Sequence, residues 1–271
     1  MTAPRARDLV LLAPACLTVM ALFAGAMAGI VRTSLVPLGG DASLAAWRSL
    51  LGDPDFSAAL LFTLRIAVVS TLLSAVVALG GAALLRDRGS ALRAMLALPV
   101  PVPHLLVATL AVLWLGPGGI VERVLGSLPL DVVRDRAGLG VTLVYVVKEA
   151  PFLLVLVLAA CGPDLKGREE AAAVLGAGPW RRLRWVTWPT IRGPLVIGSI
   201  IVAAYAAGSF EVPLAIGPNF PPTLATYAYE ATQGDVIAGQ GEAAAALLVA
   251  SALAVVMALA AVRFARDVEG G

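Results

Sequence analysis

The sequence predicts an all-α protein that crosses a membrane six times. Of its 271 residues, 59% are hydrophobic and only 14% are charged, and the mean hydropathy is +0.90. Soluble domains are about half apolar and about a quarter charged, so an ordinary soluble globule is excluded. The apolar residues gather into six runs, several of them too long for strands and without the period-two alternation of a membrane β-barrel.

Each run is long enough for a bilayer-spanning helix, which needs about 20 mostly apolar residues. The expected spans cover residues 9–31, 57–85, 92–116, 137–161, 193–217 and 242–262. The first run follows Arg5 and Arg7 and contains Ala26-Met27-Ala28, which is similar to a signal-peptidase site. At about 23 residues this run is longer than a usual signal core, so we expect a retained helix.

The basic residues between the runs predict the orientation of the chain. With the N-terminus inside, 13 of the 20 Lys and Arg residues fall on the inner side and 5 on the outer side, and the other two are Arg65 and Lys148. Because inner loops of membrane proteins are enriched in Lys and Arg, both termini are expected in the cytoplasm. The chain then divides into an N-terminal helix with an outer loop (1–56), a five-helix core (57–262) and a short cytoplasmic tail (263–271).

Several functions are disfavoured by composition and motifs. The net charge is only +2, so a broad nucleic-acid-binding face is not expected. The two lysines, Lys148 and Lys166, do not follow a glycine, so the chain lacks the G-K pair of an ATP-binding P-loop. His104 is the sole histidine, and Cys16 and Cys161 lie in separate apolar runs, so no metal site is expected.

The cytoplasmic loop 162–192 carries the one extended motif. Its pattern predicts a helix capped by Asp164, a break at 176–178, and a second helix that opens at Pro179 and ends at Pro189. The second helix combines tryptophans and arginines, which also suits an amphipathic element lying in the lipid headgroup zone. Composition alone therefore does not distinguish an element with a specific role from an amphipathic element that lies in the headgroup zone.

The spacing in this loop resembles the E-A-A-x3-G-x9-I-x-L-P signature of permease subunits of ABC importers. The match is carried by Glu170, Ala171, Ala172, Gly176, Val186, Trp188 and Pro189, with Val186 in place of Ile and Trp188 in place of Leu. The resemblance extends over roughly residues 57–262. Segment 98–103 resembles the proline-rich third span of this family, and segment 209–214 is similar to segments of polyamine-, ferric-iron- and sulfate-type permeases.

This resemblance implies a six-helix bundle like that of type I ABC-importer permeases, acting as a non-catalytic subunit. It implies that ATP is used by two separate ATP-binding subunits, and that the chain itself holds no cofactor. A second permease subunit, identical or different, and an extracytoplasmic solute-binding protein are the other implied partners. The residues implied to couple the permease to the ATPase are Glu170, Ala171, Ala172, Gly176, Val186 and Pro189.

Four ionisable residues lie within the expected spans, where charge is costly and is by default a sign of function. They are Arg65, Lys148, Glu149 and Glu211. In one interpretation they form ion pairs between helices. In the other, one or more of them line the solute path, with Pro151 and Pro213 breaking helices around it. Their mixed signs leave polyamine, iron and small oxyanions open as solutes, and His104 is expected to hydrogen-bond one helix to another.

Two other classes are alternatives to the permease interpretation. A membrane-embedded enzyme needs a cluster of catalytic residues, which the sequence does not offer. A secondary transporter needs two related halves, and no internal repeat is visible.

Overall fold

The computed structural model describes residues 6–36, 41–126, 132–234 and 239–270. All regular elements in these ranges are helices, as predicted. Six helical segments are long and apolar enough to cross a membrane, which confirms the expected number. They are Leu12–Leu35, Pro54–Leu85, His104–Leu125, Leu139–Ala160, Pro179–Gly208 and Gly239–Ala265.

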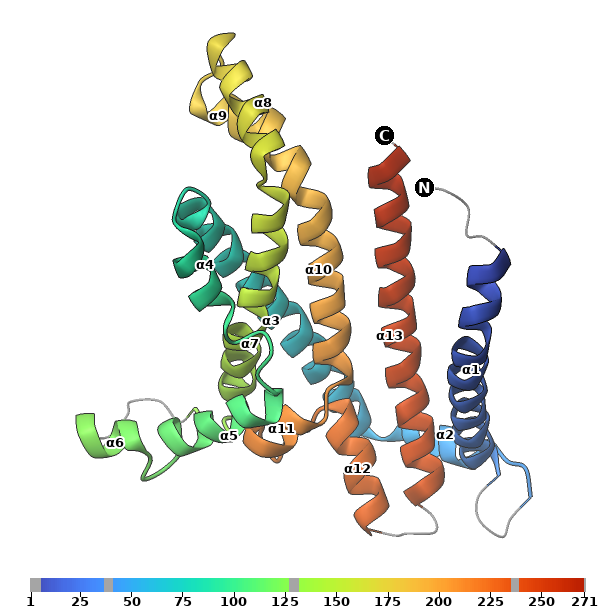
Figure 1. The fold of residues 1–271 in the computed structure, drawn as a ribbon. Helices are drawn as coiled ribbons and strands as arrows, with labels where there is room; N and C mark the ends of the chain where they lie inside the picture. The colour runs from blue at the N-terminus through green and yellow to red at the C-terminus, as the bar shows by residue number, and fades with distance from the viewer. Residues whose placement is uncertain (1–5, 37–40, 127–131, 235–238, 271) are drawn as a thin grey trace. The chain divides into compact units, whose positions relative to one another are not determined.

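Figure 1 shows the order of the helices along the chain. Their bounds are α1 Ala6–Leu35, α2 Ala45–Gly52, α3 Pro54–Leu85, α4 Ser90–Ala97, α5 His104–Leu115, α6 Ile120–Leu125, α7 Leu139–Ala160, α8 Pro163–Val174, α9 Pro179–Arg182, the π-helical turn η1 Leu183–Thr187, α10 Trp188–Gly208, α11 Glu211–Ile216, α12 Leu224–Gly234 and α13 Gly239–Gly270. They group into two compact units, one of residues 1–56 with 227–249 and one of residues 57–226 with 250–271.

The first unit contains α1, α2, most of α12 and the start of α13. Its polar centre is Tyr227, whose hydroxyl lies 2.6 Å from Asp53 Oδ2 and 2.6 Å from Glu242 Oε1. The ring of Tyr227 also packs edge-on against Phe56, with the centroids 6.0 Å apart. By contrast, the apolar side chains of α1 are largely exposed, which suits a helix that faces lipid.

The second unit is built around α7, which packs against α10, α5, α11 and α4. Tyr145, Leu153 and Val157 of α7 are completely buried and belong to the two apolar cores of this unit. Side chains of α7 pack directly on the backbone of α10 at Gly198, where an added Cβ would lie 2.6 Å from Leu156 Cδ1. Close approach at a small residue is typical of membrane helix pairs.

Two of the expected spans are interrupted. The run 92–116 forms α4 and α5, separated at 98–103, where three prolines lack the N–H groups that would continue a helix. The run 193–217 is helical to Gly208 and resumes in α11 after a break at Ser209, whose ψ of 136° is extended. The expectation that Pro151 breaks a helix is wrong, because Pro151 lies inside α7. The break at Ser209 lies four residues before Pro213, where a proline ring clashes with the helical carbonyl, as expected for Pro213.

Candidate functional site

The loop between α7 and α10 begins with the helix α8. Gly162 caps this helix and Pro163 occupies its first turn, so the expected cap at Asp164 is wrong and Asp164 lies in the first turn instead. The helix ends in a Schellman motif, in which Gly176 N–H donates to Ala173 O (3.0 Å) and Ala177 N–H donates to Ala172 O (2.9 Å). Gly176 has φ +83°, so the reversal after α8 uses the left-handed conformation that favours glycine.

The second part of the loop runs into the next membrane helix without a break. The helix α9 opens at Pro179, as expected, and continues through η1 into α10. Pro189 lies in the first turn of α10, so the expectation that it ends a helix is wrong. Pro189 closely follows the π-helical turn of this continuous helix, and as a proline it lacks the N–H that would extend the hydrogen-bond pattern. At the junction of η1 and α10, Thr190 Oγ1 donates a hydrogen bond to Val186 O (2.9 Å).

A charged network holds the base of the loop. Arg86, just after α3, donates from Nη1 to Glu169 Oε1 of α8 at 2.9 Å, and the hydroxyl of Thr187 in η1 donates to the same oxygen. Burial by itself would raise the pKa of Glu169, but the hydrogen bonds from Thr187 and Arg86 outweigh it and lower the pKa. The bond to Glu169 raises the pKa of Arg86. This network was not predicted, and its only signal in the sequence was two opposite charges in loops that are expected on the same side of the membrane.

The signature residues fall into two groups, a turn that is exposed to solvent and a residue that packs on the apolar core. Glu170, Ala171 and Gly176 are exposed, whereas Val186 is half-buried and packs on the core that contains Leu153 and Val157. Glu170 is the eighth residue of α8, too far from its N-terminus to act as a cap. The remaining members are Ala172, which is half-buried, and Pro189, which is exposed.

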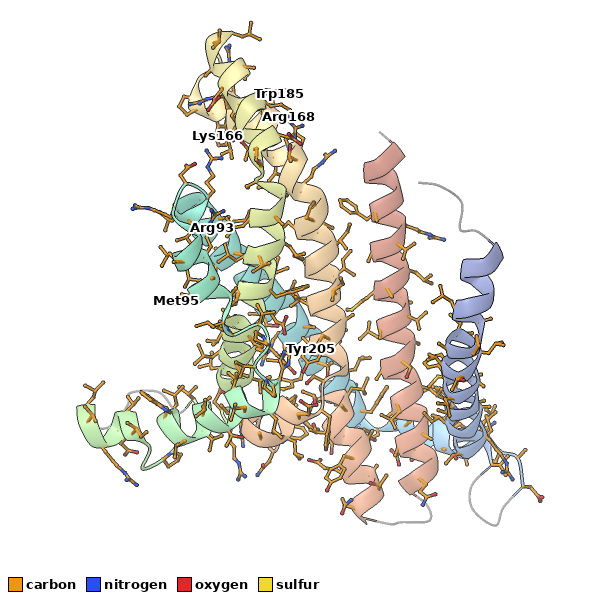
Figure 2. The ribbon with its side chains drawn as sticks, viewed as in Figure 1. Arg93, Met95, Lys166, Arg168, Trp185 and Tyr205 are labelled. Carbon is orange, nitrogen blue, oxygen red and sulfur yellow. The ribbon has the colours of Figure 1, made fainter. Side chains whose placement is uncertain are left out.

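The tip of this turn presents apolar side chains to solvent. Val174 and Leu175 are 88% and 87% exposed at the end of α8. Lys166, Arg168 and Trp185 lie at the same end of the second unit, whereas Tyr205 lies further along α10 (Figure 2). An apolar tip with basic neighbours is a surface suited to a protein partner.

The ionisable residues of the spans do not form the expected ion pairs with one another. In the described parts of the chain, Arg65 donates to Ala137 O and Lys148 donates to Val100 O, each at 2.6 Å. Glu149 Oε1 lies 2.6 Å from His104 Nε2 instead. Val100 belongs to the non-helical segment 98–103, so its carbonyl is available to a side chain. Glu211 is exposed in the first turn of α11.

His104 connects three helices of the second unit. It starts α5, contacts Glu149 of α7, and stacks on Tyr205 of α10 with ring centroids 4.3 Å apart. Tyr205 in turn meets the ring of Tyr145 edge-on at 6.3 Å. Lys148 is buried beside Glu149. The break before α5 thus places His104, Lys148, Glu149 and Tyr205 in one polar cluster, and it agrees with the expected helix-to-helix role of His104.

Residues 85–270 match a protein family described as the inner membrane component of binding-protein-dependent transport systems. The chain belongs to this family. The matched region includes the whole 162–192 loop. It also includes Lys148, Glu149 and Glu211, whereas Arg65 lies outside it.

Curated relatives of the family align with most of the chain. The chain is 30% identical over 242 residues to the inner membrane ABC transporter permease protein YnjC of Escherichia coli, covering 84% of this chain and 46% of YnjC. It is 30% identical over 167 residues to the sulfate transport system permease protein CysW of Synechocystis, covering 59% of each. It is 28% identical over 221 residues to the molybdenum transport system permease protein ModB of Escherichia coli, covering 78% of this chain and 93% of ModB. The chain thus spans about half the length of YnjC and somewhat more of CysW.

Solved structures share the fold. A chain of a bacterial alginate ABC transporter, crystallised with a periplasmic protein bound to an alginate pentasaccharide, superposes with a TM-score of 0.75 at 22% identity. The alignment covers 97% of this chain and 96% of that one. The shared fold therefore includes residues of both compact units.

Proposed function

We propose that this chain is the permease subunit of an ABC importer, which forms part of the solute path and couples it to a separate ATPase. The observation that carries the proposal is the exposed turn from Glu170 to Gly176, which is held rigidly to two membrane helices in a chain of this family. The chain has no catalytic role of its own, and ATP is used by two ATP-binding subunits. A second permease subunit and an extracytoplasmic solute-binding protein complete the assembly.

The turn is suited to transmit motion. Its apolar tip, Val174 and Leu175, offers the ATPase a contact surface, and Glu170 beside it offers a carboxylate for an ATPase cation. The anchor between Arg86 and Glu169 ties α8 to α3, while α9 continues through η1 into α10. A displacement of the tip is therefore passed to two membrane helices at once, because packed helices move as rigid elements.

The polar cluster around His104 is the proposed contact for the solute. It lies at the break between α4 and α5, and irregular backbone within membrane helices is tolerated where it is buried or lines a cavity. Lys148 and Glu149 add one cation and one carboxylate to it. Relatives named for sulfate and molybdenum transport favour a small oxyanion over a polyamine or iron as the solute.

Gly176→Val tests the coupling role. Valine is poorly tolerated at φ +83°, so the reversal after α8 is distorted, while the membrane helices still insert. We expect normal membrane levels, loss of the cognate ATPase in a pull-down, and loss of uptake. The matched control is Gly178→Val, because Gly178 lies in the same loop with equally open surroundings but has φ −65°. Full ATPase binding and uptake by the Gly176→Val protein would refute the proposal.

A further inference from the structure

A pocket of about 620 Å³ lies beside the loop in the second unit. It is enclosed by the C-terminal ends of α3 and α7 and by the segment from α9 to the first turn of α10. Leu79, Val157 and Ile191 are among the apolar residues of its wall, and all three belong to segments that can span a membrane. Its size is within the range of ligand sites. Arg86 and Glu169 also line it, but the proposed coupling role needs no ligand in it.

The polar part of the pocket is positively charged. Arg86, Arg182 and Arg184 line it together with one acid, Glu169. Glu169 is already engaged by Arg86 and Thr187. Arg182 Nε is buried and has no hydrogen-bond partner among the described residues. The pocket therefore combines one unsatisfied donor, Arg182 Nε, and net positive charge with an apolar wall.

Two tryptophans add a third feature. Trp180 and Trp188 line the pocket and are 70% and 43% exposed. Trp188 is one of the two departures from the permease signature, which has leucine there. Tryptophan is enriched at the boundary between hydrocarbon and headgroups, because its ring is apolar and its N–H is polar. The pocket thus combines the three kinds of group that a lipid molecule would contact: an apolar wall, cations and interfacial aromatic rings.

We propose that this pocket binds one anionic phospholipid from the membrane leaflet next to the loop. Its phosphate contacts Arg182 and Arg184, and an acyl chain lies along Leu79 and Val157. Basic pockets at the cytoplasmic ends of membrane helices are typical sites for anionic headgroups. An ATPase side chain is the weaker occupant, because the pocket wall is made by membrane helices and the exposed apolar tip, Val174 and Leu175, does not line it.

Native mass spectrometry of the purified full-length chain tests the charge requirement, with phosphatidylglycerol and phosphatidylcholine titrated separately. We expect the chain to retain phosphatidylglycerol preferentially. Arg184→Gln is expected to weaken this binding about fivefold, the usual effect of one basic residue at an anionic membrane surface. Arg181→Gln is the matched control, because Arg181 is a neighbour with the same charge that does not line the pocket. Equal retention of the two lipids, or equal effects of the two substitutions, would overturn the proposal.

A pair of neutral substitutions tests the apolar wall. Ala83 lines the pocket and Leu84 does not, although both are exposed near the end of α3. Ala83→Phe is expected to abolish preferential retention of phosphatidylglycerol, and Leu84→Phe to preserve it. Preferential retention of phosphatidylglycerol by the Ala83→Phe protein would refute the lipid site. Displacement of the lipid by added cognate ATPase would also refute it. None of these measurements depends on transport, so the inference can fail while the proposed function stands.

Discussion

Arg86 and Glu169 are 83 residues apart in the sequence, yet Arg86 Nη1 lies 2.9 Å from Glu169 Oε1. The contact joins the end of one membrane helix to the middle of the loop helix α8. Thr187 donates to the same carboxylate from η1, so one side chain connects α3, α8 and the start of α10. Hydrogen bonds to an ionised acceptor are stronger than neutral ones. Glu169 is therefore the residue on which the position of the loop depends most directly.

Glu169→Gln is expected to destabilise the loop, whereas Glu170→Gln is not. The amide keeps the shape of Glu169 but loses the charge, which costs about 1 kcal/mol because the Arg86 side chain is 34% exposed. Glu170 is exposed, so its substitution leaves stability within about 0.5 kcal/mol and lowers ATPase binding instead. Thermal unfolding in detergent and an ATPase pull-down separate the two effects. Equal melting temperatures for the two variants would contradict this assignment.

Lowering the pH should remove the stabilisation that the ionised Glu169 carboxylate provides. The pKa of Glu169 is lowered in the folded protein from its ordinary value of 4.5, so the unfolded chain takes up the proton first as pH falls. The stabilisation is present above about pH 4.5 and is lost as pH falls through the lowered value. Melting temperatures of the wild-type and Glu169→Gln proteins should therefore differ at pH 7 and converge toward pH 3. A gap that does not change across this range would show that the carboxylate's charge is not the cause.

Glu149 and His104 should behave as a coupled pair. Glu149→Leu leaves His104 Nε2 without its acceptor in a half-buried site and should cost about 1 kcal/mol, lowering the yield of folded protein. Removing both partners, as in His104→Leu with Glu149→Leu, should recover much of that loss, because no polar group is then left unpaired. Glu149→Gln keeps an acceptor, so we expect near-normal yield with reduced uptake. Additive losses in the double variant would show that the two residues act independently.

The sequence predicted features that depend on composition and on short-range geometry. The six apolar runs, the helix at the start of the 162–192 loop and the reversal at Gly176 all follow from hydropathy and the conformational preferences of glycine and proline. Pro189 shows the limit of such reasoning, since a proline that ends one helix and a proline in the first turn of the next have the same local sequence.

Contacts between distant segments could not be predicted from the sequence. Four intramembrane charges suggested ion pairs among themselves, but the break at 98–103 supplied a free carbonyl for Lys148 and placed His104 against Glu149. Glu169 and Glu170 are adjacent and chemically identical, and only the packing of α8 turns one toward Arg86 and the other toward solvent. The signature identified Glu170, whereas the structure also identifies Glu169.

The orientation of the chain is the last prediction, and accessibility of single cysteines tests it. In a background with Cys16→Ala and Cys161→Ala, Arg136→Cys precedes α7 and Lys166→Cys lies in α8, and both native side chains are exposed. The basic residues place position 136 outside and position 166 inside. A membrane-impermeant maleimide added to intact cells should therefore label position 136 only, and both positions should react after the membrane is opened. Labelling of position 166 in intact cells would contradict the predicted orientation. It would also refute the coupling role, because the loop would then be on the side of the membrane that has no ATP.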